Sequence, residues 1–218
     1  MLIPPALLPE FIQAMSDTVE KHAEEVAVLD QAIGDGDHVF NLRRGLLALN
    51  QQSTELAILD WAAAWQNIGM SMMSSIGGAS GSLYGTLFMA MSKAARDKPL
   101  TRETFADVFA QGVESVKQRG KAGAGEKTML DVYIPVSEYL NSIKASEDIV
   151  DVLKKIVLVA TEGMESTRDM VATKGRASFL GERSKGHIDA GARTGQLMIC
   201  AVVDVITEYL GKTSTSPT

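Results

Sequence analysis

Residues 101–120, TRETFADVFAQGVESVKQRG, decide the fold of this chain. Apolar or small side chains recur in this stretch at intervals of 3, 4, 7, 8 and 11 residues from the first. They are Phe105, Val108, Phe109, Gly112, Val113 and Val116. This spacing places them on one side of a helix with a period of about 3.6 residues. The stretch therefore predicts an amphipathic α-helix.

The same spacing recurs over residues 149–160 and again over residues 197–209. We find no apolar–polar alternation bounded by hairpin turns, which would indicate strands. Pro135 falls inside a helical pattern and predicts a kink or an early break. Helices are expected at 7–28, 38–50, 57–75, 80–96, 102–119, 127–143, 147–172 and 190–210. Because the connections are short, the sequence predicts an all-α fold, an eight-helix antiparallel up-and-down barrel or bundle.

No linker-like composition interrupts the pattern, so we expect a single domain over residues 1–211. The small, polar residues 212–218 predict a flexible tail. The 21 basic residues against 27 acidic ones give a net charge of −6, which disfavours a nucleic-acid partner. Cys200 is the only cysteine, which excludes a disulfide framework and a cysteine-rich zinc site. With neither a signal-peptide pattern nor an apolar run of about 18 residues, we expect a cytoplasmic protein without a membrane span.

The connection LDQAIGDGDH, residues 29–38, gathers three carboxylates, Asp30, Asp35 and Asp37. Like charges repel, so the cluster favours a bound cation, and short, hard oxygen ligands suit Mg²⁺. An ordinary turn and a helix cap at Asp37 are alternatives. An EF-hand loop is excluded, because Phe40 and Leu46 stand where it needs glycine and glutamate. His38 is either a ligand or a hydrogen-bonding group at the start of a helix.

Three further connections are rich in glycine. Residues 77–81, GGASG, predict either a turn or a phosphate cradle at the start of the next helix. Residues 119–129 read as a solvated turn. Residues 174–191 form a long basic connection in which Arg176 suits a bidentate contact with phosphate.

The predicted topology brings these four connections together. Alternate connections of an up-and-down bundle lie at the same end, and these four follow the first, third, fifth and seventh predicted helices. We therefore expect carboxylates, glycine-rich backbone and an arginine to meet at one rim. That combination predicts a magnesium–nucleotide site.

The stretches LDQAIGDGDHVFN, SSIGGASGSLYGT, RGKAGAGEKTMLD and KGRASFLGERSKGHIDAG give the chain a family resemblance. The sequence resembles the nucleotide-binding L subunits of bacterial dihydroxyacetone kinases. The resemblance implies ADP or ATP held at one end of a helical barrel through two Mg²⁺ ions. By matching position, it implies Asp30, Asp35 and Asp37 as metal ligands. It implies nucleotide contacts at His38, Asn41, Ala79, Ser80, Gly120, Met129, Arg176, Asp189 and Gly191.

The resemblance also implies an activity and its partners. The chain would pass a phosphoryl group to dihydroxyacetone, or a related short ketose, bound on a separate K subunit, and would act only with that partner. Arg176 is the candidate catalytic residue. Free ATP and an M-type protein of the phosphotransferase system remain alternative phosphoryl donors, and a homodimer is a candidate assembly. The competing functions are a nucleotide-loaded regulatory module and an L-type kinase domain for another acceptor.

Several positions depart from the family pattern, among them Arg193, Thr194 and Gly195, which replace a small, hydroxyl-rich helix start. Val39 stands at the last glycine of GDGDHG, Glu126 stands where aspartate is usual, and Ala190 replaces a common proline. The metal-binding aspartates are intact. Residues 175–191 are expected to be mobile without ligand and to close over a bound nucleotide.

Overall fold

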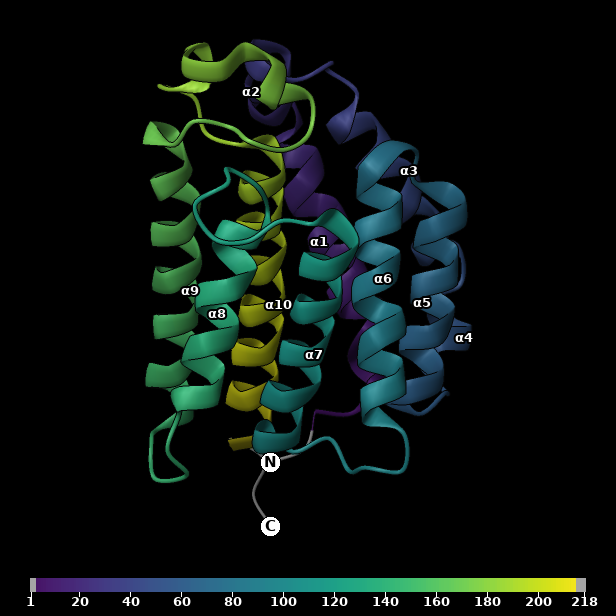
Figure 1. Ribbon diagram of the computed structural model, residues 1–218. Coiled ribbons are helices and arrows are strands. Elements are labelled where there is room, and N and C mark those ends of the chain that lie inside the picture. The colour runs from purple at the N-terminus through teal and green to yellow at the C-terminus, as the bar shows by residue number, and fades with distance from the viewer. Residues whose placement is uncertain (1–2, 215–218) are drawn as a thin grey trace.

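The computed structural model describes residues 3–214, and all regular secondary structure in that range is helical (Figure 1). The prediction of an all-helical fold is confirmed. The longer helices are α1 (Leu8–Lys21), α2 (Ala23–Ile33), α3 (His38–Gln51), α5 (Trp61–Ser75), α6 (Gly78–Ala95), α7 (Arg102–Gly120), α8 (Leu130–Ser142), α9 (Ile149–Ser166) and α10 (Ala190–Ser214). The short elements are α4 (Ser53–Leu56) and the 3₁₀ segments η1 (Pro5–Leu7), η2 (Thr167–Asp169) and η3 (Arg176–Ser184).

The long helices stand side by side and pack in a closed order (Figure 1). Within residues 3–214, each helix in the order α1, α3, α5, α6, α7, α8, α9, α10 contacts the next one. Helix α10 in turn packs against α1 and closes the ring. Apolar side chains from these helices fill the interior as one cluster, with Val19, Leu42, Val108 and Val132 among its fully buried members. The periodic apolar residues of the sequence form this core.

The first predicted helix, 7–28, is in fact two helices. The backbone at His22 leaves helical geometry (φ −104°, ψ 11°), and α2 then continues to Ile33. The arginine Arg193 of α10 donates to Glu25, whose other oxygen lies 2.8 Å from His22 Nδ1. Asp30 therefore lies in the last turn of a helix and not in a loop.

Pro135 does not end its helix, because α8 runs through it. Proline lacks the N–H that would bond to the carbonyl of Asp131, four residues earlier. At that point Gly163 of α9 approaches so closely that a Cβ there would overlap the Asp131 carbonyl oxygen. The interruption in the helix is accommodated by a glycine on the neighbouring helix.

The chain between α9 and α10 is more structured than predicted. Helix α9 ends at Ser166 and not at 172, and η2 and η3 follow it. At the other end of α10, residues 212–214 of the predicted tail are helical, and residues 215–218 lie outside the described range. No helix within residues 3–214 is long and apolar enough to cross a membrane.

Candidate functional site

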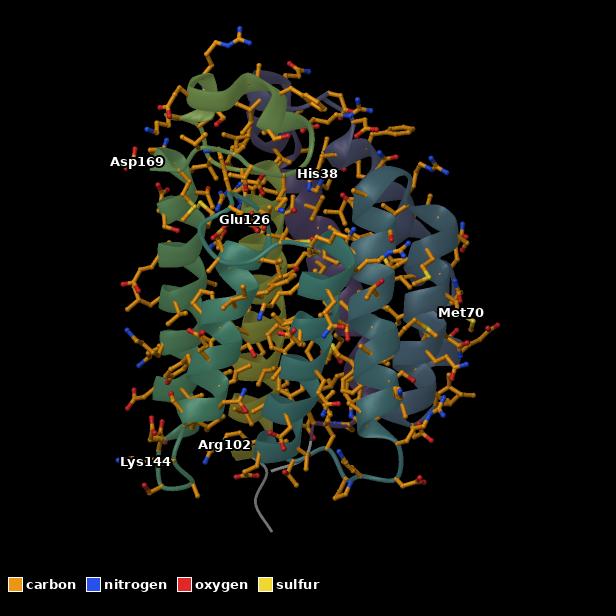
Figure 2. All side chains as sticks on the ribbon, viewed as in Figure 1. His38, Met70, Arg102, Glu126, Lys144 and Asp169 are labelled. Carbon is orange, nitrogen blue, oxygen red and sulfur yellow. The ribbon has the colours of Figure 1, made fainter. Side chains whose placement is uncertain are left out.

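A cavity of about 640 Å³ lies at the end of the helices where the four glycine-rich connections meet. Figure 2 shows His38 and Glu126 at this end, with Arg102 and Lys144 at the opposite end. Predicted site residues from all four connections line the cavity: Asp30, Asp35, Asp37, His38, Ala79, Ser80, Gly120, Met129, Arg176, Asp189 and Gly191. Asn41 is the exception. It is buried behind the wall, next to Gly77.

The three aspartates form a tight cluster. Each offers one carboxylate oxygen, and these atoms lie within 4.8 Å of one another. Oδ2 of Asp30 accepts a hydrogen bond from the backbone N–H of His38 at 3.0 Å. The side chain of Asp37 makes no capping bond to α3, so the capping alternative does not hold. Converging hard oxygen donors of one charge fit a divalent cation such as Mg²⁺.

Two glycines make this convergence sterically feasible. A Cβ at Gly34 would overlap the carboxylate of Asp30, so only glycine allows the chain to turn so close to it. Gly36 has φ +79°, in the left-handed region that favours glycine. The chain therefore folds back on itself between the aspartates, as the residues 29–38 suggested.

The start of α6 forms the second side of the cavity. Its N-cap is Gly77, no side chain caps it, and its first turn carries no acidic residue. The backbone N–H groups of a helix start carry partial positive charge and suit an anion. Gly78, with φ +66°, leads the chain into this turn. The geometry supports a phosphate cradle at Ala79 and Ser80.

The ring of His38 is held between two hydroxyl groups. Ser80 Oγ lies 3.3 Å from Nδ1, and Thr194 Oγ1 lies 2.9 Å from Nε2. The Thr194 hydroxyl also lies 3.1 Å from the carbonyl oxygen of Ala190; if it donates there, we assign its oxygen as the acceptor of His38 Nε2–H. Burial lowers the pKa of His38, and the nearby aspartates oppose that shift. The ring is thus oriented as a neutral imidazole with Nδ1 as an acceptor.

Tyr84 adds an unsatisfied polar group to the wall. Its side chain is buried, and its hydroxyl has no hydrogen-bond partner among the described residues. Burial raises its pKa, so the group remains a donor. A buried hydroxyl without a partner is costly unless a ligand or water satisfies it. The hydroxyl is enclosed near the side chains of Tyr133 and Thr194, so it makes the wall polar at this point without being exposed to the cavity.

The connection to α10 supplies the remaining charges. Arg176 Nε lies 3.0 Å from Asp35 Oδ2. Asp189 Oδ2 accepts from the N–H of Ala192 at 2.8 Å, which caps the start of α10. Burial raises the pKa of Asp189 to about 6, and the charge of Lys127 opposes the rise.

The sequence analysis assigned no site role to Lys127, Thr194 or Tyr84. Thr194 and Tyr84 lie within helical patterns, where they resemble other core residues. Lys127 belongs to the connection that we interpreted as a solvated turn, yet its side chain is fully buried. That interpretation of residues 119–129 is wrong at this position.

Comparison with known proteins places these features in a family context. The DAK2 domain matches residues 32–204. The chain is 40% identical over 193 residues to a protein of Listeria innocua, covering 88% of this chain and 92% of that one. That protein is named PEP-dependent dihydroxyacetone kinase 1, ADP-binding subunit DhaL. The ADP-binding subunit DhaL of the PEP-dependent dihydroxyacetone kinase of Escherichia coli K12 is 40% identical over 185 residues, 84% of this chain and 88% of its own.

A solved structure shows the same fold. The dihydroxyacetone kinase of C. freundii, in complex with AMP-PNP and Mg²⁺, superposes with a TM-score of 0.73 at 20% identity. The superposition covers 94% of this chain and 35% of that one. At this level of identity the likeness concerns the arrangement of helices alone.

Proposed function

The chain belongs to the DAK2 domain family, and from that premise we propose that it is the nucleotide-binding subunit of a dihydroxyacetone kinase. It transfers the γ-phosphoryl group of bound ATP to a hydroxyl of dihydroxyacetone, or of a related short ketose, held by a partner K subunit. One observation carries the proposal. The aspartate cluster, the uncapped start of α6 and Arg176 line one cavity.

In this proposal Asp30, Asp35 and Asp37 hold two Mg²⁺ ions between the protein and the nucleotide phosphates. When bound, Mg²⁺ neutralises the charge that spreads over the transferring phosphoryl group. The aspartates fix its place, since Asp30 is itself held by the N–H of His38. An oriented set of ligands is what a phosphoryl transfer site needs from the protein.

The other residues of the cavity position the phosphates. The first turn of α6 directs backbone N–H groups at them, and Ser80 and His38 lie beside that turn. Arg176 provides a planar, permanently charged group that pairs with phosphate oxygens. Its place beside Asp35 puts it within reach of the same phosphates.

The names of the relatives support a division of labour between subunits. Both are called ADP-binding subunits of PEP-dependent kinases. We therefore favour a nucleotide that remains bound as ADP and is rephosphorylated in place by a protein of the phosphotransferase system. The ketose is held by the partner subunit and meets the nucleotide at the open rim of the cavity.

The test is an assay of the purified chain with and without a K-type subunit, across a panel of short ketoses. We expect no ketose phosphorylation by the chain alone at any ATP concentration. Turnover appears when the K subunit is added together with a phosphorylated M-type protein of the phosphotransferase system, which regenerates the bound ATP. Robust turnover by the chain alone would overturn the division of labour, and failure to bind Mg²⁺–ADP would overturn the proposed function.

A further inference from the structure

The segment between α9 and α10, residues 167–189, forms a lid that carries Arg176 over the cavity. The two ends of this lid are joined to each other. Thr167 Oγ1 accepts from the N–H of Asp189 at 3.0 Å. The carbonyl oxygen of Arg168 accepts from the N–H of Gly186 at 2.8 Å. The lid is therefore a loop with a closed base.

Lys127 lies at that base although it comes from the connection before α8. Its ammonium group donates to the carbonyl oxygens of Thr167 and His187, one at each end of the lid. Its side chain is only 1% exposed. A single buried cation thus joins the lid's two ends to the wall of the cavity.

Glu126, the residue before Lys127, holds a different part of the lid. Glu126 Oε1 accepts from the hydroxyl of Thr173 at 2.9 Å and lies 3.3 Å from Lys174 Nζ. Its other oxygen accepts from the N–H of Gly123 at 2.6 Å, which ties the carboxylate to its own connection. Glu126 holds the lid from the surface while Lys127 holds it from inside.

A purely space-filling role does not account for a lysine at this position. Burying an ammonium group costs free energy unless it is hydrogen-bonded, and a methionine would fill similar volume without that cost. The carbonyl oxygen of His187 would then lose the Lys127 donor, and, among residues 3–214, that of Thr167 would keep only the N–H of Met170 at 3.3 Å. The charge and the hydrogen bonds are therefore the properties that the site uses.

The remainder of the lid has few other anchors. A small apolar cluster of Ile33, Ala172 and Ala177, with Leu180 against it, attaches the lid to the end of α2. Arg176 itself pairs with Asp35 at 3.0 Å, so its position depends both on that ion pair and on how the base of the lid is held. The same base includes Asp189, which starts α10 at the cavity wall.

We propose that Lys127 is a positioning residue that closes the base of the lid and thereby sets where Arg176 and Asp189 stand at the cavity. Its effect on the nucleotide rests on the proposed function above. Its effect on the lid is independent of the proposed function. The two effects can be tested separately.

The informative variant is Lys127→Gly. Lys127 has φ +61°, a conformation that glycine adopts without strain, so the substitution removes the side chain and relaxes the backbone. We expect Mg²⁺–ADP affinity to fall about 10- to 100-fold. This is the usual range for a residue that orients binding side chains without contacting the bound group itself. Added n-butylammonium replaces the lost side chain and restores affinity, while 1-butanol does not.

Hydrogen exchange on the ligand-free protein provides the second readout. In Lys127→Gly the amides of residues 167–189 exchange faster than in the wild type, and n-butylammonium slows them again. Val108→Ala is the matched control, because it weakens the core within α7 at a fully buried residue that does not line the cavity. It lowers the melting temperature but leaves lid exchange and ADP affinity unchanged.

Should Lys127→Gly fail to fold, Glu126→Ala tests the same connection at a side chain that is 27% exposed. It is expected to speed exchange around residues 170–176. The proposal is overturned if lid exchange in the folded variants equals that of the wild type. It is also overturned if Val108→Ala reproduces their loss of affinity. If the wild type binds no Mg²⁺–ADP, the proposed function fails and the exchange of the ligand-free lid still decides the role of Lys127.

Discussion

Arg176 Nε lies 3.0 Å from Oδ2 of Asp35, so a side chain expected to contact phosphate is paired with one expected to hold metal. Both side chains are partly exposed, at 72% and 44%, which limits what the ion pair contributes to stability. The pairing nevertheless means that Asp35 cannot give both oxygens to a metal while Arg176 remains in place. We therefore expect the two side chains to exchange partners when metal and phosphate bind together.

This exchange predicts opposite effects for Arg176→Gln. Without nucleotide, the variant should bind Mn²⁺, used as a spectroscopic substitute for Mg²⁺, up to about fivefold more tightly, because a competing cation is gone. With nucleotide, it should bind Mg²⁺–ADP more weakly, because a phosphate contact is lost. Electron paramagnetic resonance titration measures the first and calorimetry the second. Arg183→Gln, on the same lid, is the matched control, and a change of the same sign in both titrations would contradict the exchange.

The aspartate cluster predicts a loss of binding without a loss of fold. Asp35→Asn or Asp37→Asn should abolish tight Mg²⁺-dependent ADP binding while circular dichroism shows unchanged helix content. Relief of repulsion among the carboxylates should stabilise the ligand-free variants. Titration calorimetry with and without EDTA decides the assignment. An ADP affinity that is unchanged by EDTA and by the substitutions would refute it. Glu55→Gln, at an exposed residue on α4, is the control.

The partly buried carboxyl of Asp189 predicts a pH dependence of stability. Its pKa is raised from 3.8 to about 6, so ionisation is harder in the folded than in the unfolded chain. The contribution of Asp189 to wild-type stability therefore falls as pH rises through this interval, by about 3 kcal/mol in total. Asp189→Asn keeps an oxygen for the N–H of Ala192 and removes the ionisation.

The measurement for Asp189 is urea unfolding of the metal-free protein from about pH 4 to about pH 7. Relative to the wild type, Asp189→Asn should gain stability as pH rises and the difference should level off above the folded-state pKa. Parallel curves for the two proteins across the interval would show that Asp189 ionises equally easily in both states.

The lid predicts ligand-dependent protection. Its middle is held to α2 by a small apolar cluster around Ile33, so we expect residues 175–185 to exchange more rapidly than the base of the lid when no ligand is bound. They should become protected when Mg²⁺–ADP binds. Lys212→Ala, near the end of α10, should leave nucleotide binding unchanged. Equal exchange rates with and without ligand would make the segment a simple connection.

Local patterns predicted the helices well where local contacts determine them. Helix α7 begins with a capping box, in which the side chains of Thr101 and Thr104 each accept a hydrogen bond from the other residue's backbone N–H. The apolar residues of this helix recur at a regular helical spacing. The predicted range 102–119 accordingly differs from Arg102–Gly120 by one residue. The aspartates were also predictable, since the glycines that bend the chain lie between them.

Features fixed by distant residues were not predictable. The break at His22 is accompanied by contacts with Arg193, which lies 171 residues later. Lys127 is buried because its hydrogen-bond acceptors, the carbonyl oxygens of Thr167 and His187, lie 40 and 60 residues away. Every residue has a backbone carbonyl, so the amino-acid sequence does not show which carbonyl oxygens will accept from Lys127. The pattern around Lys127 therefore resembled that of an exposed turn.

The pairing of α1 with α10 has a consequence for how the chain is made. This seam joins α1 to α10, so it can form only after α10 has left the ribosome. Until then α1 has α3 beside it but lacks α10, and part of its apolar side stays open to water or to a chaperone. Contacts of such long sequence separation are slow to form because a large loop must close first. Asp189 and Gly191 arrive with α10, so a nascent chain acquires its complete cavity only when the ring of helices closes.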